Sequence, residues 1–154
     1  MSLQPARLET APDGTPLIVV PGGRWRAAPD ALPAIRHDLL GGNDLPSRWQ
    51  ARERFVILDT GFGTGLRFLA AWQQWRTDPV RCRRLHFIAC ESHPLAAPDL
   101  ARALRPWPEL AGLASALVAC WPVLTSGLHR LRLDGGQVVL TLVFGDAAAQ
   151  RGQH

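Results

Sequence analysis

A glycine-rich turn between an apolar run and an amphipathic segment constrains the fold of this chain most strongly. Residues 54–59 read Arg-Phe-Val-Ile-Leu-Asp, a pattern typical of a strand buried on both faces in a parallel sheet covered by helices. After the turn, apolar residues recur at helical spacing as far as Thr77, and Pro79 prevents continuation. A second apolar run over 85–90 predicts another buried strand. The pattern therefore predicts a β-α-β unit with parallel strands and a right-handed crossover.

The flanking sequence completes an α/β pattern. Two further helices are expected over about 95–105 and 109–119, and strands over 128–133 and 138–144 form a hairpin around a DGG turn. Residues 1–37 are rich in proline and arginine, so we expect an N-terminal segment of loop with one strand-like run, 17–20, as an edge strand or hairpin arm. Residues 38–154 are expected to form the α/β domain.

Composition excludes several classes of protein. No apolar run reaches the 18 or more residues that a membrane span needs, and the first residues do not resemble a secretion signal. Three scattered cysteines predict neither a disulfide framework nor a zinc site, and no histidine pair has metal-ligand spacing. We therefore expect a cytoplasmic protein without a metal. All 17 basic side chains are arginine, which permits a nucleic-acid partner, although a GC-rich genome gives the same excess.

Acids and glycines follow the predicted parallel strands where ligands bind open α/β sheets. Asp59 precedes the turn, in which glycines let a ligand approach main-chain N–H groups at a helix N-terminus. Glu91 follows the second strand, where a carboxylate can accept hydrogen bonds from ribose hydroxyls, and Asp146 follows the third, placed for an adenine amine. The spacing G-x-G-x-G differs from the dinucleotide fingerprint G-x-G-x-x-G, so NAD(P) is the minority alternative.

Several motifs together resemble one family of enzymes. They are Leu-Gly-Gly-Asn-Asp-Leu at 40–45, Asp-Thr-Gly-Phe-Gly-Thr-Gly at 59–65, Arg-Leu-His-Phe-Ile at 84–88, Trp-Pro-Glu-Leu at 107–110 and Phe-Gly-Asp at 144–146. Over residues 38–146 the chain is similar to the N-terminal methyltransferase domain of the MnmC family, which modifies the tRNA wobble uridine. The resemblance implies a Rossmann-like class I fold and methyl transfer from S-adenosylmethionine to 5-aminomethyl-2-thiouridine. It places the cofactor on Asp59, Thr60, Gly61, Phe62, Gly63, Thr64, Gly65, Glu91 and Asp146, with Gly42 and Asn43 nearby.

The chain also departs from the family pattern. Its N-terminal segment differs, and the sequence does not reach the motif after the next strand that lies beside the methyl-accepting amine. We therefore expect an incomplete sheet with an exposed first strand, covered by a partner chain or an oligomer, and weak or no activity alone. No catalytic residue is assigned. The alternatives are a non-catalytic remnant or cofactor-binding module, and an NAD(P)-binding oxidoreductase fragment.

Overall fold

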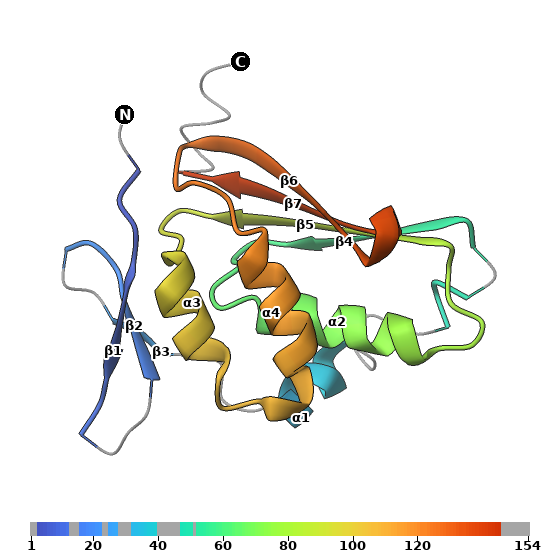
Figure 1. Cartoon of the computed structure of the whole chain (residues 1–154), viewed down its shortest axis with the longest axis horizontal. Helices are drawn as coiled ribbons and strands as arrows, with labels where there is room; N and C mark the ends of the chain where they lie inside the picture. The colour runs from blue at the N-terminus through green and yellow to red at the C-terminus, as the bar shows by residue number, and fades with distance from the viewer. Residues whose placement is uncertain are drawn as a thin grey trace.

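A four-stranded mixed sheet forms the centre of the molecule (Figure 1). The computed structural model describes residues 3–12, 16–22, 25–27, 32–39, 47–50 and 52–145. The strand order is β4-β5-β7-β6, in which β4, β5 and β7 are parallel and β6 is antiparallel to β7. The strands are β4 (Arg54–Asp59), β5 (Arg84–Glu91), β6 (Gly127–Leu133) and β7 (Val138–Phe144).

The predicted β-α-β unit and hairpin are both confirmed. Helix α2 (Leu66–Thr77) connects β4 to β5, and its end at Thr77 agrees with the position of Pro79. The hairpin joins β6 to β7 through the turn Asp134–Gly136. Among the described strands β4 pairs only with β5, so it lies at an edge of the sheet, as the sequence predicted.

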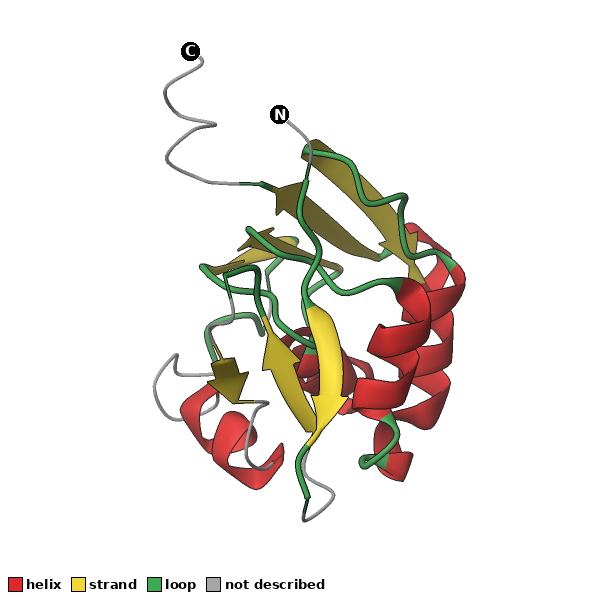
Figure 2. Ribbon diagram, turned by 90° about the vertical axis from the view of Figure 1, so that its left-hand side faces the viewer, coloured by secondary structure: helices red, strands yellow, loops and turns green. Residues whose placement is uncertain are grey.

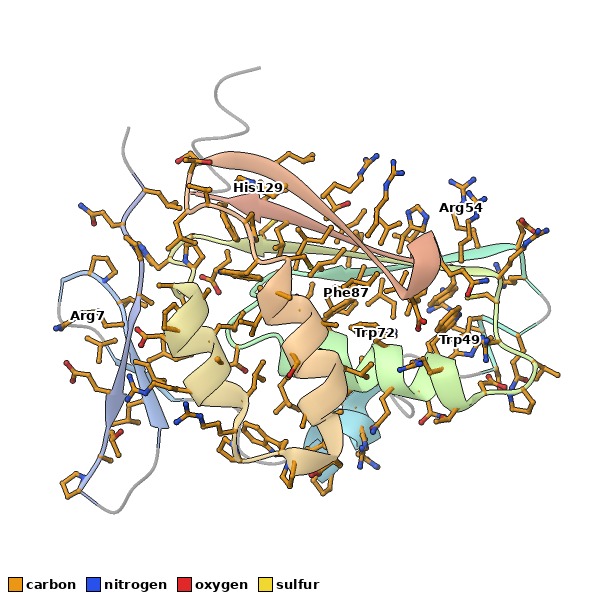
Figure 3. The ribbon with its side chains drawn as sticks, viewed as in Figure 1. Arg7, Trp49, Arg54, Trp72, Phe87 and His129 are labelled. Atoms are coloured by element: carbon orange, nitrogen blue, oxygen red, sulfur yellow. The ribbon has the colours of Figure 1, made fainter. Side chains whose placement is uncertain are left out.

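The helices of the described chain cover one face of this sheet. Helices α2, α3 (Ala97–Leu104) and α4 (Ala111–Ala119) lie on the same side, and α1 (Leu32–His37) packs against α2 (Figure 1). Phe87 of β5 is 1% exposed and points into the layer between sheet and helices (Figure 3). Burial of this apolar layer is the main stabilising contribution to the domain. No helix in the described ranges is long and apolar enough to cross a membrane.

The other face of the sheet is more exposed than the sequence predicted. Burial on both faces of β4 was expected, but Val56 is 45% exposed and Leu58 is 75% exposed. Alternate residues of a strand point to opposite faces, so both lie on the side that carries none of the described helices. The apolar run correctly indicated a strand. It could not indicate whether a second helical layer covers that strand.

The strand expected over 17–20 is confirmed, but the expectation that the rest of residues 1–37 is loop was wrong. Strands β1 (Arg7–Thr10), β2 (Pro16–Val19) and β3 (Trp25–Ala27) form an antiparallel sheet in which β2 is central (Figure 2). This small sheet contacts the main domain through Leu8 of β1, whose N–H donates a hydrogen bond to the Asp99 carboxylate of α3 at 3.3 Å. Strands of three or four residues are too short to show a clear periodicity, which explains why the sequence pattern missed β1 and β3.

Asp134 ties the hairpin turn to α2. Its Oδ2 accepts a hydrogen bond from the Trp72 indole N–H at 2.9 Å and forms an ion pair with Arg76 at 3.2 Å. Asp134 also has a φ of 53°, which asparagine tolerates better than alanine. We expect Asp134→Ala to lower the free energy of unfolding by about 1–3 kcal/mol. Asp134→Asn should cause a much smaller loss of stability. Urea denaturation of both variants tests this, and equal losses would contradict it.

Candidate cofactor-binding site

The glycine turn joins the carboxyl end of β4 to the N-terminus of α2. Gly63 and Gly65 have φ angles of 59° and 79°, in the left-handed region that favours glycine. Gly65 is the N-cap residue of α2, and no side chain in the described part of the chain caps this helix end. The first N–H groups of a helix have no intrahelical acceptor and favour negative charge. The turn therefore presents main-chain donors at its helix end.

Glu91 lies against this turn. Its side chain is buried, at 3% exposure, and Oε1 accepts a hydrogen bond from the Gly63 N–H at 2.7 Å. Oε2 accepts from the N–H of His93 at 3.1 Å. The structure thus brings together the glycine turn and the acid that the sequence placed at the end of the neighbouring strand.

Asp59 begins the turn. Its Oδ1 accepts a hydrogen bond from the Gly61 N–H at 3.1 Å, in the geometry of an Asx turn. Asp59 is half-buried, whereas Thr60 and Gly61 are exposed. A Cβ atom added to Gly61 would meet nothing within 4 Å. The outer part of the turn is therefore accessible from solvent.

Phe62 has a packing role beneath the turn. Its ring is 5% exposed and stacks on Trp121 with a centroid distance of 5.4 Å. Its N–H donates to the carbonyl of Cys90 at 3.0 Å, which ties the turn to β5. Phe62 was predicted as a cofactor-binding residue. Because the ring is buried in the core, any contact with a ligand would involve its main chain.

The side-chain oxygen of Thr64 has no hydrogen-bond partner among the residues that the structure describes. The residue is 1% exposed, and its Oγ1 accepts or donates no hydrogen bond within the described residues. Buried hydroxyls nearly always have a partner, since an unsatisfied one costs about 1–3 kcal/mol. An orphaned hydroxyl in the turn is the kind of group that a bound polar ligand can satisfy.

The sequence did not predict two sets of contacts that hold the loops of the site in place. The Trp121 indole donates to the carbonyl of Leu95, which links the loop after β5 to the ring beneath the glycine turn. The N-terminal segment reaches the same loop, because the Ala6 N–H donates to the Pro94 carbonyl and His93 Nδ1 lies 2.9 Å from the Gln4 carbonyl. No local pattern indicates contacts between residues so far apart in the chain.

Three predicted residues, Gly42, Asn43 and Asp146, lie outside the described residues. The described chain reaches Gly145, whose N–H donates to the carbonyl of Glu91 at 3.0 Å. The ends of β5 and β7 are therefore adjacent. Within the described ranges, no group of three or more His, Cys, Asp or Glu side chains is arranged to hold a metal ion.

A groove of about 550 Å³ lies elsewhere, between α3 and α4. It is separate from the glycine turn, and none of the predicted site residues that the structure describes lines it. Its walls are mainly apolar and contain several small side chains. The lining residues are Ala101, Leu104, Arg105, Trp107, Pro108, Ala111, Ala114, Ser115, Val118 and Ala119.

Comparison with known sequences confirms the resemblance to MnmC. The chain is 53% identical over 147 residues to the tRNA 5-methylaminomethyl-2-thiouridine biosynthesis bifunctional protein MnmC of Azoarcus sp. (strain BH72). It is 49% identical over 147 residues to the protein of the same name from Thiobacillus denitrificans. These matches cover 96% of this chain but 23% and 24% of the relatives, so the chain spans about a quarter of their length. No family model matches the sequence.

Comparison with solved structures supports the fold. The chain is similar to MNMC2 from Aquifex aeolicus, with a TM-score of 0.57 and 18% sequence identity. The match covers 98% of this chain and 46% of the Aquifex chain. This similarity agrees with the Rossmann-like α/β fold that the sequence predicted.

Proposed function

We propose, from the similarity to MnmC along nearly the whole chain, that this protein takes part in modifying the wobble uridine of tRNA. In this proposal the glycine turn and Glu91 bind S-adenosylmethionine, which supplies a methyl group for the exocyclic amine of 5-aminomethyl-2-thiouridine. Because tRNA is modified in the cytoplasm, this proposal includes a cytoplasmic location for the protein. The observation that carries the proposal is the hydrogen bond between the buried Glu91 carboxylate and the Gly63 N–H.

The residues of the turn fit this cofactor in three ways. The uncapped N-terminus of α2 offers N–H donors for the methionyl carboxylate. The Thr64 hydroxyl, buried and without a described partner, offers a further polar contact. Glu91, at the carboxyl end of β5, would accept hydrogen bonds from the ribose hydroxyls. Positioning of the two reactants would supply most of the rate enhancement, and we assign no general base.

Calorimetric titration with S-adenosylhomocysteine tests the cofactor assignment. We expect saturable binding of one ligand per chain, and no comparable binding of NAD or FAD. Glu91→Gln should weaken the affinity at least about tenfold, or about 1.4 kcal/mol, because the amide loses the charge and one acceptor. Glu53→Gln is the matched control, since it removes an exposed carboxylate beside the amino end of β4 and should leave binding unchanged.

The outcomes separate the alternatives. Tighter binding of NAD or FAD than of S-adenosylhomocysteine would contradict the cofactor assignment. Transfer of labelled methyl groups from S-adenosylmethionine to tRNA from cells that lack MnmC tests the reaction itself. Cofactor binding without such transfer would instead identify a cofactor-binding module.

A further inference from the structure

The segment that contains β1 is bonded to the loop after β5. Nδ1 of His93 lies 2.9 Å from the main-chain carbonyl of Gln4, 89 positions away in the sequence. The next residue of the loop, Pro94, accepts a hydrogen bond at its carbonyl from the Ala6 N–H at 3.2 Å. β1 and α3 are also in contact at this side of the molecule (Figure 1). We call residues 3–10 the N-terminal strap.

The contact with Gln4 fixes the role of the His93 side chain. A main-chain carbonyl oxygen can only accept a hydrogen bond, so Nδ1 of His93 carries the hydrogen and donates it. His93 is half-buried, so water competes only partly for this donor. The bond therefore holds the ring, and with it the main chain of the loop, against the strap.

The main chain of His93 in turn holds the Glu91 carboxylate. Its N–H donates to Oε2 at 3.1 Å, while Oε1 accepts from the Gly63 N–H at 2.7 Å. The carboxylate thus lies between one donor in the loop and one donor in the glycine turn. Glu91 is 3% exposed, so a displaced carboxylate would lose these bonds where little water can replace them. The orientation of Glu91 therefore depends on the position of His93.

The strap has its own attachment to the rest of the fold. The Leu8 N–H donates to Oδ2 of Asp99 in α3 at 3.3 Å, and Oδ1 of the same carboxylate accepts from Arg102 at 3.2 Å. β1 also pairs with β2 along its length. Because both α3 and β2 hold β1, the nearby Gln4 carbonyl is a fixed acceptor for the His93 ring.

Other contacts keep the loop folded when the His93 side chain is changed. Leu95 is 1% exposed, and its carbonyl accepts a hydrogen bond from the Trp121 indole at 2.9 Å. The bond between Ala6 and Pro94 joins main-chain atoms and does not involve the His93 ring. The contribution of that ring is therefore local, and its main effect is on the position of the loop next to Glu91.

We infer that His93 is a positioning residue for Glu91, and that it acts through the hydrogen bond from its ring to the Gln4 carbonyl of the strap. This bond sets the main chain of the loop, and the His93 N–H then aligns the carboxylate on the glycine turn. The alignment does not depend on which ligand binds. Its consequence for binding rests on the proposed function, in which Glu91 accepts from the ribose hydroxyls.

Two substitutions separate positioning from direct contact between the ring and the cofactor. His93→Asn removes the ring and keeps a donor, because Nδ2 of asparagine occupies the place of Nδ1 of histidine. His93→Phe keeps an aromatic ring and removes the donor. We expect His93→Asn to bind S-adenosylhomocysteine like the unmodified chain, and His93→Phe to bind it about threefold to tenfold more weakly in calorimetric titration.

A double variant tests whether the effect passes through Glu91. Without the carboxylate there is nothing for His93 to align, so Glu91→Ala combined with His93→Phe should bind no more weakly than Glu91→Ala alone. A further loss in the double variant equal to that of His93→Phe alone would show that the two residues act independently, which would overturn the inference.

Hydrogen exchange tests the alignment without any ligand. The Gly63 amide is protected by its bond to Glu91, so it should exchange about threefold to tenfold faster in His93→Phe and at the unmodified rate in His93→Asn. His129→Phe is the matched control, because Nε2 of His129 lies 2.8 Å from the Thr125 carbonyl in the same kind of contact, outside the loop after β5. It should leave both Gly63 exchange and ligand affinity unchanged.

The remaining outcomes each decide the question. Equal exchange of the Gly63 amide in the unmodified chain and in His93→Phe would overturn the inference. Full affinity in His93→Phe with reduced affinity in His93→Asn would also overturn it, and would assign the ring to direct contact with the ligand. Faster exchange of amides throughout the chain in His93→Phe would leave His93 a purely structural role. If the unmodified chain binds no S-adenosylhomocysteine but Gly63 exchange changes as expected, the proposed cofactor is wrong and the positioning role stands.

Discussion

Gly65→Ala is expected to lower the free energy of unfolding by about 2–4 kcal/mol. A Cβ atom at this position would lie 2.6 Å from Cζ and 2.8 Å from Cε2 of Phe62. That ring cannot move away easily, because it is stacked on Trp121 and packed near Phe68. The φ angle of 79° adds backbone strain for any residue with a Cβ atom. Chemical denaturation measures the loss.

Two other glycines of the same turn separate these causes. Gly63 also has a positive φ, but a Cβ atom there meets nothing within 4 Å, so Gly63→Ala should cost only about 1 kcal/mol. Gly61 has neither a positive φ nor a close neighbour, and Gly61→Ala should be nearly neutral. If all three variants lost the same stability, close packing of Phe62 would not be the reason for glycine at position 65.

Asp78→Ala is expected to lower the free energy of unfolding by about 2–4 kcal/mol. The carboxylate is 5% exposed and accepts a hydrogen bond from the indole N–H of Trp49 at 2.8 Å and from the Val80 N–H at 3.0 Å. Trp49 is fully buried, so the substitution leaves its donor without an acceptor. Asp78→Asn keeps a carbonyl acceptor and should lose less. Thermal or urea unfolding compares the two, and an equal loss would exclude the indole bond as the cause.

The same carboxylate gives a pH dependence with a defined sign. Burial alone would raise the pKa of Asp78, but hydrogen bonds from Trp49, Val80 and Gln50, with the charge of Arg81, outweigh it and lower the pKa. The carboxylate therefore stabilises the fold fully above its unfolded pKa of about 4, and this contribution is lost as the pH falls through the lower folded value. The stability difference between the unmodified chain and Asp78→Asn should narrow below about pH 4. A constant difference down to pH 2 would contradict the assignment.

Local sequence patterns were sufficient for the centre of the fold. The apolar run of β4, the glycine turn and the helical spacing of α2 are each determined within a few residues, so their order could be predicted. The turn at 134–136 could likewise be predicted locally, from an aspartate followed by two glycines, all of which adopt positive φ angles. Parallel pairing then followed from the intervening helix, because adjacent parallel strands need such a crossover.

Long-range features could not be predicted in this way. The exposure of Leu58 depends on what covers the sheet, which its apolar neighbours in the sequence do not indicate. The bond between Trp49 and Asp78 joins a loop before β4 to the C-cap of α2, and neither residue belongs to a motif. The packing of Phe62 beneath the glycine turn likewise depends on Trp121, which is far away in the sequence.

The arrangement of the candidate site could be predicted only in part, because some of its contacts are also long-range. Glu91 and the turn were expected to lie together because the carboxyl ends of parallel strands meet at one edge. The sequence did not indicate that Glu91 would accept a hydrogen bond from the turn itself. The contributions proposed for Gly42, Asn43 and Asp146 stay predictions, since these residues lie outside the described ranges.

The attachment of β1 has a consequence for folding during synthesis on the ribosome. Leu8 bonds to Asp99, 91 residues later in the chain, and Gln4 contacts His93 across 89 residues. At a translation rate of about 5–20 residues per second, the first strand waits about 5–20 s for its binding site to be synthesised. The loop after Glu91 thus gains this support only after most of the chain has been synthesised.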